Sequence, residues 1–200
     1  VSIDGETPVA YKIPKEKTSL RLFEHKKPAV TDVSIVHRTE NWQGELRVDN
    51  FTASDGTFLR PAPLPTRKIM ILGDSVTCGE AVDREAGKTK NPSWWNARDS
   101  YGYLIARALK AQVHLVCWGG RGLVRSWNGN TDEGNLPVFS EWALADKTPW
   151  NPLNYQPDLI LSAIGTNDFS QDIPEPNTYI TTYIDFLERL HIQYPGARIA

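Results

Sequence analysis

Three short apolar runs, each followed at once by glycine and small polar residues, limit the folds open to this chain more than any other feature of its sequence. The runs occupy residues 67–72, 112–117 and 158–164. A continuous apolar run of this length, bounded by turn residues, is typical of a strand buried on both faces. Apolar residues at helical spacing predict helices at about residues 100–110 and 177–194. This alternation of strands and helices predicts an α/β domain with a parallel sheet.

The turn after the first run, Gly73-Asp74-Ser75, delivers a serine to the carboxyl end of a buried strand. Gly73 permits a tight turn, and helix-compatible residues follow Ser75. A serine at a helix start has a free backbone N–H beside the positive end of the helix dipole, which suits a nucleophile. A simpler role is also open, because Asp74 or Ser75 would cap such a helix well.

Hydrogen-bond donors follow the other two runs. Gly120 lies in the turn after the second run and Asn167 in the turn after the third. Ligands of parallel α/β sheets bind beyond the carboxyl ends of the strands, so we expect Ser75, Gly120 and Asn167 to converge on one crevice. A serine with two such donors is the minimal equipment for acyl transfer, because N–H groups stabilise the oxyanion that forms when Oγ attacks a carbonyl.

These turns also resemble the ordered motifs of the SGNH hydrolases of the GDSL type. Three of the four motifs are matched, by Gly73-Asp74-Ser75, Gly119-Gly120 and Gly165-Thr166-Asn167-Asp168. Together with the upstream segment 38–44, Arg-Thr-Glu-Asn-Trp-Gln-Gly, they most resemble the deacetylases of carbohydrate esterase family 2. The resemblance covers about residues 36–200.

The resemblance implies a flavodoxin-like parallel sheet with flanking helices and a serine esterase that needs no metal or other cofactor. Its expected substrates are O-acetylated carbohydrates such as xylan, glucomannan or related oligosaccharides. Ser75 would be the nucleophile, and the backbone N–H groups of Ser75 and Gly120 with the Asn167 amide would form the oxyanion hole. Asp74 and Asp168 are expected to orient the turns, and Asp168 is also a candidate substrate contact.

The fourth motif, Asp-x-x-His, does not occur in these 200 residues. The four histidines are His25, His37, His114 and His191. His191 falls on the apolar face of the predicted helix 177–194 and His114 within a strand, which are positions typical of packing. Residues 197–200 have the pattern of a strand that is just beginning. We therefore expect the general-base histidine to lie beyond Ala200 in a longer natural protein.

Tryptophan is concentrated in two long polar segments between the motifs, residues 81–99 and 119–156. Long loops in compact domains are usually functional, and aromatic faces beside amide groups suit sugar rings. Trp94, Trp95 and Trp127 are therefore candidate substrate-binding residues. The alternative is that these side chains pin the loops to the body of the domain.

The first 59 residues have a different pattern. Short β-type runs at residues 20–24, 33–38 and 45–48 are separated by turn residues, which predicts a β-sandwich. Residues 60–66 hold three prolines and predict a semi-rigid linker to a hydrolase domain at 67–200. The resemblance implies that residues 1–59 are the later part of a jelly-roll domain.

Composition excludes two classes of partner. The chain carries 22 basic and 24 acidic side chains, for a net charge of −2, and has no basic stripe for nucleic acid. It has no apolar run near the roughly 18 residues that span a bilayer. Cys78 and Cys117 lie near predicted strand ends, where they could be neighbours and pair, although two buried thiols are the simpler prediction. Residues 1–6 carry no signal peptide, and a secreted or periplasmic location is implied by the resemblance alone.

Two other functions fit the same residues. Lipases and thioesterases share the superfamily motifs, and the polar, tryptophan-rich loops argue only weakly against an acyl channel. A carbohydrate-binding protein without chemistry fits the β-rich first segment and the missing histidine. The sequence holds no His-Glu-x-x-His or Cys-x-x-Cys pattern, so no metal site is expected. The sugar, the hydroxyl that carries the acetyl group and the oligomeric state are left open.

Overall fold

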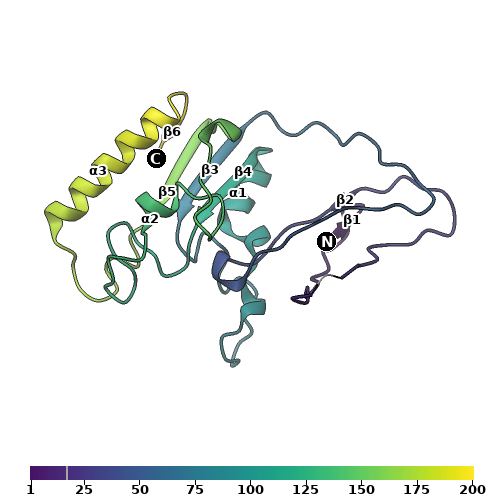
Figure 1. The fold of residues 1–200 in the computed structure, drawn as a ribbon, viewed down its shortest axis with the longest axis horizontal. Helices are drawn as coiled ribbons and strands as arrows, with labels where there is room; N and C mark the ends of the chain where they lie inside the picture. The colour runs from purple at the N-terminus through teal and green to yellow at the C-terminus, as the bar shows by residue number, and fades with distance from the viewer. Residues whose placement is uncertain (17) are drawn as a thin grey trace. The chain divides into compact units, whose positions relative to one another are not determined.

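The computed structural model describes residues 1–16 and 18–200. In chain order its elements are β1 (Ser2–Ile3), β2 (Val33–Ser34), η1 (Asn41–Gln43), β3 (Lys68–Gly73), η2 (Pro92–Trp94), η3 (Ala97–Asp99), α1 (Tyr101–Leu109), β4 (Gln112–Cys117), α2 (Leu136–Phe139), η4 (Pro152–Asn154), β5 (Leu159–Ala163), α3 (Pro176–Gln193) and β6 (Arg198–Ile199) (Figure 1). The described residues divide into two compact units, 1–37 and 38–200.

A four-stranded parallel sheet with helices beside it forms the larger unit. The strand order is β4-β3-β5-β6, and every neighbouring pair is parallel. β3, β4 and β5 match the three apolar runs to within one residue at each end, and α1 and α3 match the two predicted helices as closely. β6 also forms within the predicted residues 197–200. The α/β prediction is therefore confirmed.

The register of the strands brings their carboxyl ends level with one another. Gly73, the last residue of β3, pairs with Cys117 on β4 and with Ala163 on β5. The turns that leave these strands consequently start from one edge of the sheet, which is the edge where ligands of parallel α/β sheets bind.

Successive residues of a strand point to opposite faces of the sheet, so each face presents its own set of apolar side chains. A different helix covers each set. On one side Met70, Leu72 and Ile160 form a buried core with Phe186 and Leu190 of α3. Figure 1 shows α3 and α1 on either side of the strands.

On the other face, α1 approaches the sheet closely at Gly102. A Cβ atom at this position would lie 2.7 Å from Leu115 Cδ2 and 2.8 Å from Ile71 Cδ1. A larger residue there would push α1 away from β3 and β4, because both side chains are held in the sheet.

The smaller unit holds far less regular structure than its sequence predicts. β1 and β2 pair antiparallel over two residues each, and the run predicted at residues 33–38 is a strand only at Val33–Ser34. The strands predicted at residues 20–24 and 45–48, the second of which lies in the larger unit, are wrong. Their apolar side chains, such as Leu20 and Val48, are 43% and 54% exposed and meet no facing sheet. A β-type pattern forms a strand only where a partner strand pairs with it.

The boundary between the compact units lies at His37, ahead of the predicted linker. Arg38 Nε donates to the Trp95 carbonyl at 2.8 Å, and the Glu40 side chain accepts the Gly119 N–H at 2.6 Å. These bonds tie residues 38–40 to the α/β unit. The role of residues 60–66 as a linker between a β-sandwich and a hydrolase domain stays a prediction.

A disulfide joins Cys78 to Cys117, with their Cα atoms 5.6 Å apart, so the prediction of two free thiols is wrong. Cys78 follows β3 by five residues and Cys117 ends β4. Both cysteines were predicted to lie near strand ends, but only the parallel pairing of β3 with β4 makes them neighbours. The bond connects the turn that holds Ser75 to the strand that leads to Gly120.

Replacing both cysteines with serine is expected to lower the free energy of unfolding by about 4 kcal/mol, the chain-entropy value for a closed loop of this size. The sequence separation of the two cysteines is 39 residues. Urea unfolding of the double variant and of the oxidised protein measures the difference. Wild-type protein unfolded with a reductant is the matched control and should move in the same direction. Equal stability of all three samples would contradict a structural role for the bond.

Candidate active site

Ser75 lies two residues beyond β3, half-buried, in a run of turns. Cys78 N–H donates to the Asp74 carbonyl at 3.1 Å, and Glu80 N–H donates to the Ser75 carbonyl at 2.8 Å. Residues 74–80 therefore form little more than one helix-like turn. The helix expected after Ser75 does not form. Gly79, with φ at +83°, redirects the chain, and a Cβ there would lie 2.5 Å from the Asn96 carbonyl oxygen.

Close packing of Thr77 against Gly73 holds the Ser75 turn in place. A Cβ on Gly73 would lie 2.0 Å from Thr77 Oγ1, so only glycine fits beneath this turn. Thr77 is buried, and its hydroxyl shares a 2.7 Å hydrogen bond with the Tyr101 hydroxyl at the start of α1. Neither the hydroxyl nor the backbone N–H of Ser75 has a hydrogen-bond partner among the described residues. Both groups are therefore free for a ligand.

Asp74 joins the Ser75 turn to the third turn. Its carboxylate is buried, accepting the Val76 N–H at 3.0 Å and the Asn167 side-chain amide at 3.3 Å. Burial raises the pKa of Asp74, and the Val76 N–H opposes this effect. The contacts fit the predicted orienting role.

Asn167 bonds to both of the other turns. Its Nδ2 donates to the Arg121 carbonyl at 2.8 Å and to Asp74 Oδ2 at 3.3 Å. Asp74 and Arg121 are the chain neighbours of Ser75 and Gly120. Hydrogen bonds thus bring the three predicted residues to one edge of the sheet. Both N–H hydrogens of the amide are engaged here, so its use in an oxyanion hole, which stays a prediction, requires it to exchange one of these bonds.

Gly120 has a backbone conformation that favours glycine, with φ at +78°. Its carbonyl accepts the Trp127 N–H at 2.9 Å, and a Cβ would lie 2.8 Å from Trp127 Cδ1. Its own N–H has no acceptor in the described part of the chain. The turn therefore presents an unused N–H donor near the Ser75 turn.

Asp168 is fully buried, so the prediction that it contacts substrate is wrong. Its carboxylate accepts the backbone N–H groups of Leu123 and Val124 at 2.8 Å and of Arg125 at 3.1 Å. These bonds hold the loop after Gly120 in place, which is the other role, orienting a turn, that was expected of Asp168.

The three predicted tryptophans differ in exposure. Trp94 and Trp95 are only 4% and 3% exposed, so they anchor their loop and the substrate-binding prediction is wrong for them. Trp127 is 58% exposed and packs against Gly120, which leaves its role in substrate binding open. Trp42, which lies outside the two tryptophan-rich segments, is 52% exposed and meets Trp95 edge-on, with ring centroids 5.4 Å apart. The resemblance of segment 38–44 was the only signal for it.

Two histidines of the α/β unit lie away from Ser75. His114 lies midway along the edge strand β4, where it pairs with Met70, packs against Trp150 and Tyr155, and has its pKa lowered by burial. His191 is exposed on α3, contrary to the prediction that it packs. The expectation that the general base lies outside these residues stays a prediction.

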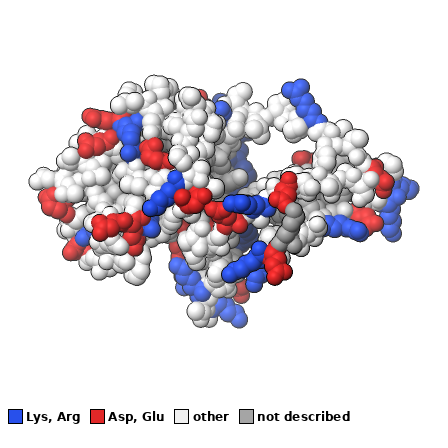
Figure 2. Space-filling model, viewed as in Figure 1, with Lys and Arg blue, Asp and Glu red and all other residues white. Residues whose placement is uncertain are grey.

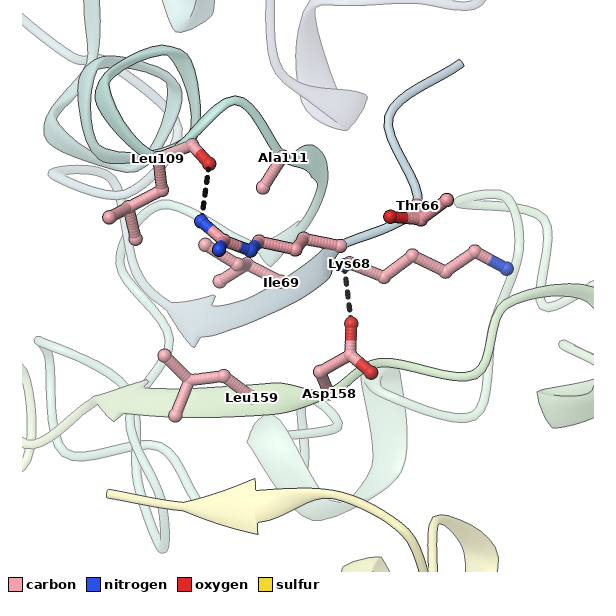
Figure 3. A pocket seen from close by; sticks show the side chains of 8 residues that line it. Thr66, Lys68, Ile69, Leu109, Ala111, Asp158 and Leu159 are labelled. Atoms are coloured by element: carbon pink, nitrogen blue, oxygen red, sulfur yellow. Dashed lines mark hydrogen bonds between the residues drawn. The ribbon is translucent and has the colours of Figure 1, made fainter. Parts of the chain in front are cut away.

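The pocket in Figure 3 is at the other edge of the sheet. It has a volume of about 460 Å³ and is lined where β3 and β5 begin. There Lys68 N–H donates to Asp158 Oδ2 at 2.8 Å, and the Arg67 guanidinium donates to the Leu109 carbonyl at 3.3 Å. These two bonds use the Asp158 carboxylate and the Arg67 guanidinium, and the pocket is remote from the carboxyl ends of the strands.

Surface charge, possible metal ligands and helix hydrophobicity of the described residues bear on other kinds of partner. Figure 2 shows basic and acidic side chains interspersed on the visible face. In the described ranges, no three His, Cys, Asp or Glu side chains gather in a metal-binding arrangement. No helix in the same ranges has the length and apolar character needed to cross a membrane.

Two protein families match the chain. Residues 71–200 match the GDSL-like lipase/acylhydrolase family, and residues 1–63 match the carbohydrate esterase 2 N-terminal family. An acetylxylan esterase / glucomannan deacetylase from Cellvibrio japonicus is 53% identical over all of this chain, which spans 56% of that protein. The cellulase/esterase CelE of Acetivibrio thermocellus is 26% identical over 98% of the chain, which spans 24% of that protein.

Solved structures give the same result. The structure of a family two carbohydrate esterase from Cellvibrio japonicus superposes with a TM-score of 0.69 and 61% identity, over 72% of this chain and 44% of that one. A family two carbohydrate esterase from Clostridium thermocellum, in complex with cellohexaose, gives 0.66 and 28% identity over 71% and 44%. The predicted SGNH-type sheet is confirmed by these likenesses.

Proposed function

The chain belongs to the GDSL-like lipase/acylhydrolase family, and from this premise we propose that it supplies the nucleophile and oxyanion donors of a serine esterase that removes O-acetyl groups from carbohydrates. The observation that carries the proposal is the meeting of three turns at one sheet edge. There the Ser75 hydroxyl and the N–H groups of Ser75 and Gly120 have no bonding partner among the described residues.

The proposed reaction has two stages. Ser75 Oγ attacks the acetyl carbonyl carbon while a histidine outside these 200 residues takes its proton, and that proton passes to the departing sugar oxygen as its bond to the acetyl carbon breaks. Water then hydrolyses the acetyl-enzyme to acetate. The N–H groups of Ser75 and Gly120 stabilise the oxyanion in both stages, and the Asn167 amide joins them by exchanging its 3.3 Å bond to Asp74 Oδ2 for one to the oxyanion. One such donor contributes about 3–4 kcal/mol to the stability of the transition state.

The substrate class rests on relatives and on exposed aromatic side chains. One relative carries the name acetylxylan esterase / glucomannan deacetylase, and one similar structure holds cellohexaose. Trp127, exposed beside Gly120, presents an indole face that can stack on a sugar ring. Acetylated xylan and glucomannan are therefore the proposed substrates.

A secreted or periplasmic location accompanies this proposal. The bond between Cys78 and Cys117 supports it, because disulfides persist mainly in oxidising compartments. Polymeric plant carbohydrate is also a substrate that an enzyme meets outside the cell.

Acetate release from acetylated xylan and glucomannan by the intact protein tests the proposal. We expect turnover of nitrophenyl acetate to exceed that of the octanoate by at least about tenfold, because several added methylenes need an apolar channel. A preference for the octanoate would favour a lipase. Sugar binding with no ester hydrolysis would favour a binding protein.

A chelator is the control for the mechanism in the same assay. Activity is expected to be unchanged by EDTA, because Ser75 and N–H donors provide the chemistry. Loss of activity with EDTA and its recovery with zinc or cobalt would contradict the serine mechanism.

A further inference from the structure

Glu40 is a buried acid that the proposed reaction does not use. It lies just before η1, and only 3% of its surface is exposed. Burial raises the pKa of Glu40, while N–H donors from Trp95 and Gly119 oppose this rise. Burying a carboxyl group is costly unless hydrogen bonds replace its water. The partners that supply these bonds therefore indicate what the group holds in place.

Each carboxylate oxygen of Glu40 has a partner from a different loop. Oε2 accepts the Gly119 N–H at 2.6 Å, and Oε1 accepts the indole N–H of Trp95 in a short hydrogen bond. A Cβ on Gly119 would lie 2.6 Å from Oε2, so the glycine lets the carboxylate reach the backbone. Glu40 thus bonds directly to the residue before Gly120.

The peptide between Gly119 and Gly120 is held by hydrogen bonds to its two neighbouring peptides. Glu40 accepts the Gly119 N–H on one side, and the Gly120 carbonyl accepts the Trp127 N–H at 2.9 Å on the other. The N–H of Gly120 belongs to this peptide and has no acceptor among the described residues. The direction of the Gly120 N–H is therefore set by two hydrogen bonds in which this N–H takes no part.

We propose that Glu40 is a positioning residue for the oxyanion hole, which holds the Gly119-Gly120 turn so that the Gly120 N–H points at the reacting carbonyl oxygen. The inference rests on the proposed esterase function. Glu40 itself touches no reacting atom. Its effect arises because a donor must be oriented before the reaction to stabilise the transition state fully.

Two variants of the intact protein test the role. Glu40→Asp keeps the charge but shortens the side chain by one methylene, and Glu40→Gln keeps one acceptor oxygen and sets an NH₂ group against the other N–H. In each variant we expect kcat for nitrophenyl acetate per folded molecule to fall by roughly tenfold or more. KM should change by less than about threefold, because the lost interaction is made mainly in the transition state.

Gln43→Ala is the matched control. Gln43 Oε1 accepts the Glu40 backbone N–H at 2.8 Å, so its loss loosens the same segment without touching the carboxylate. We expect it to lower the melting temperature and to leave kcat per folded molecule within about twofold of wild type. If the Glu40 variants behave in the same way, Glu40 is only structural and the inference is overturned.

Failure of this inference is distinguishable from failure of the esterase proposal. An inactive wild-type protein would overturn the proposed function, whereas an active wild type with Glu40 variants of normal kcat would overturn only the positioning role. If one Glu40 variant does not fold, the other gives the answer by the same measurement.

Discussion

Ser75→Ala is expected to reduce deacetylation by at least about 10⁴-fold, because loss of the nucleophile in a serine triad removes nearly all of the catalysis by that unit. The hydroxyl bonds to no described residue, so the folded structure does not depend on it. We expect the free energy of unfolding to change by no more than about 0.5 kcal/mol. Acetate release and urea unfolding, measured on the same preparation, test both parts.

Ser93→Ala is a suitable control for this change, because Ser93 is an exposed serine in η2 of the same unit. It should retain full activity. Ser75→Ala protein with activity within about tenfold of wild type would remove Ser75 from the role of nucleophile.

Asn167→Ala has the second largest expected effect. If the Asn167 amide stabilises the oxyanion, kcat per folded molecule should fall by roughly a hundredfold or more with little change in KM. A loss of stability of about 1–3 kcal/mol should accompany it, because the buried Asp74 carboxylate and the Arg121 carbonyl both lose a donor. Single-turnover kinetics and thermal unfolding separate the two effects.

Ser170→Ala perturbs the same turn without touching the amide. Ser170 Oγ donates to the Trp127 and Asn167 carbonyls, so its loss should reduce stability and leave kcat per folded molecule nearly unchanged. An Asn167→Ala protein that is less stable but turns over at the wild-type rate would reject the oxyanion role and leave Asn167 as a turn residue.

The strands and main helices were predictable because their signals are local. β3 and β5 are continuous apolar runs that end at glycine or small residues, and α3 carries apolar residues at helical spacing. Parallel pairing then follows from the alternation of strands with helices. The position of Ser75 at a strand end was predictable for the same reason.

The errors come from contacts between distant residues. Trp95 was predicted to meet substrate because its loop is long and polar, yet its indole N–H bonds to Glu40, 55 residues away in sequence. Asp168 follows a strand end like a ligand-binding residue, but its carboxylate takes N–H groups more than 40 residues away. A one-dimensional pattern does not show which polar group is consumed by such a bond.

The N-terminal strands failed for a related reason. A β-type pattern records only that a segment could pair, and the segments at 20–24 and 45–48 have no partner strand in the described structure. The disulfide shows the converse case, because Cys78 and Cys117 become neighbours only once β3 and β4 pair.

Labelling of the intact protein with a serine-directed phosphonate, followed by peptide mapping, tests the central claim most directly. The proposed mechanism predicts a single adduct on the peptide that contains Ser75, with acetate release from acetylated glucomannan falling in step with labelling. Labelling confined to another serine, or acetate release that persists after Ser75 is fully modified, would contradict it.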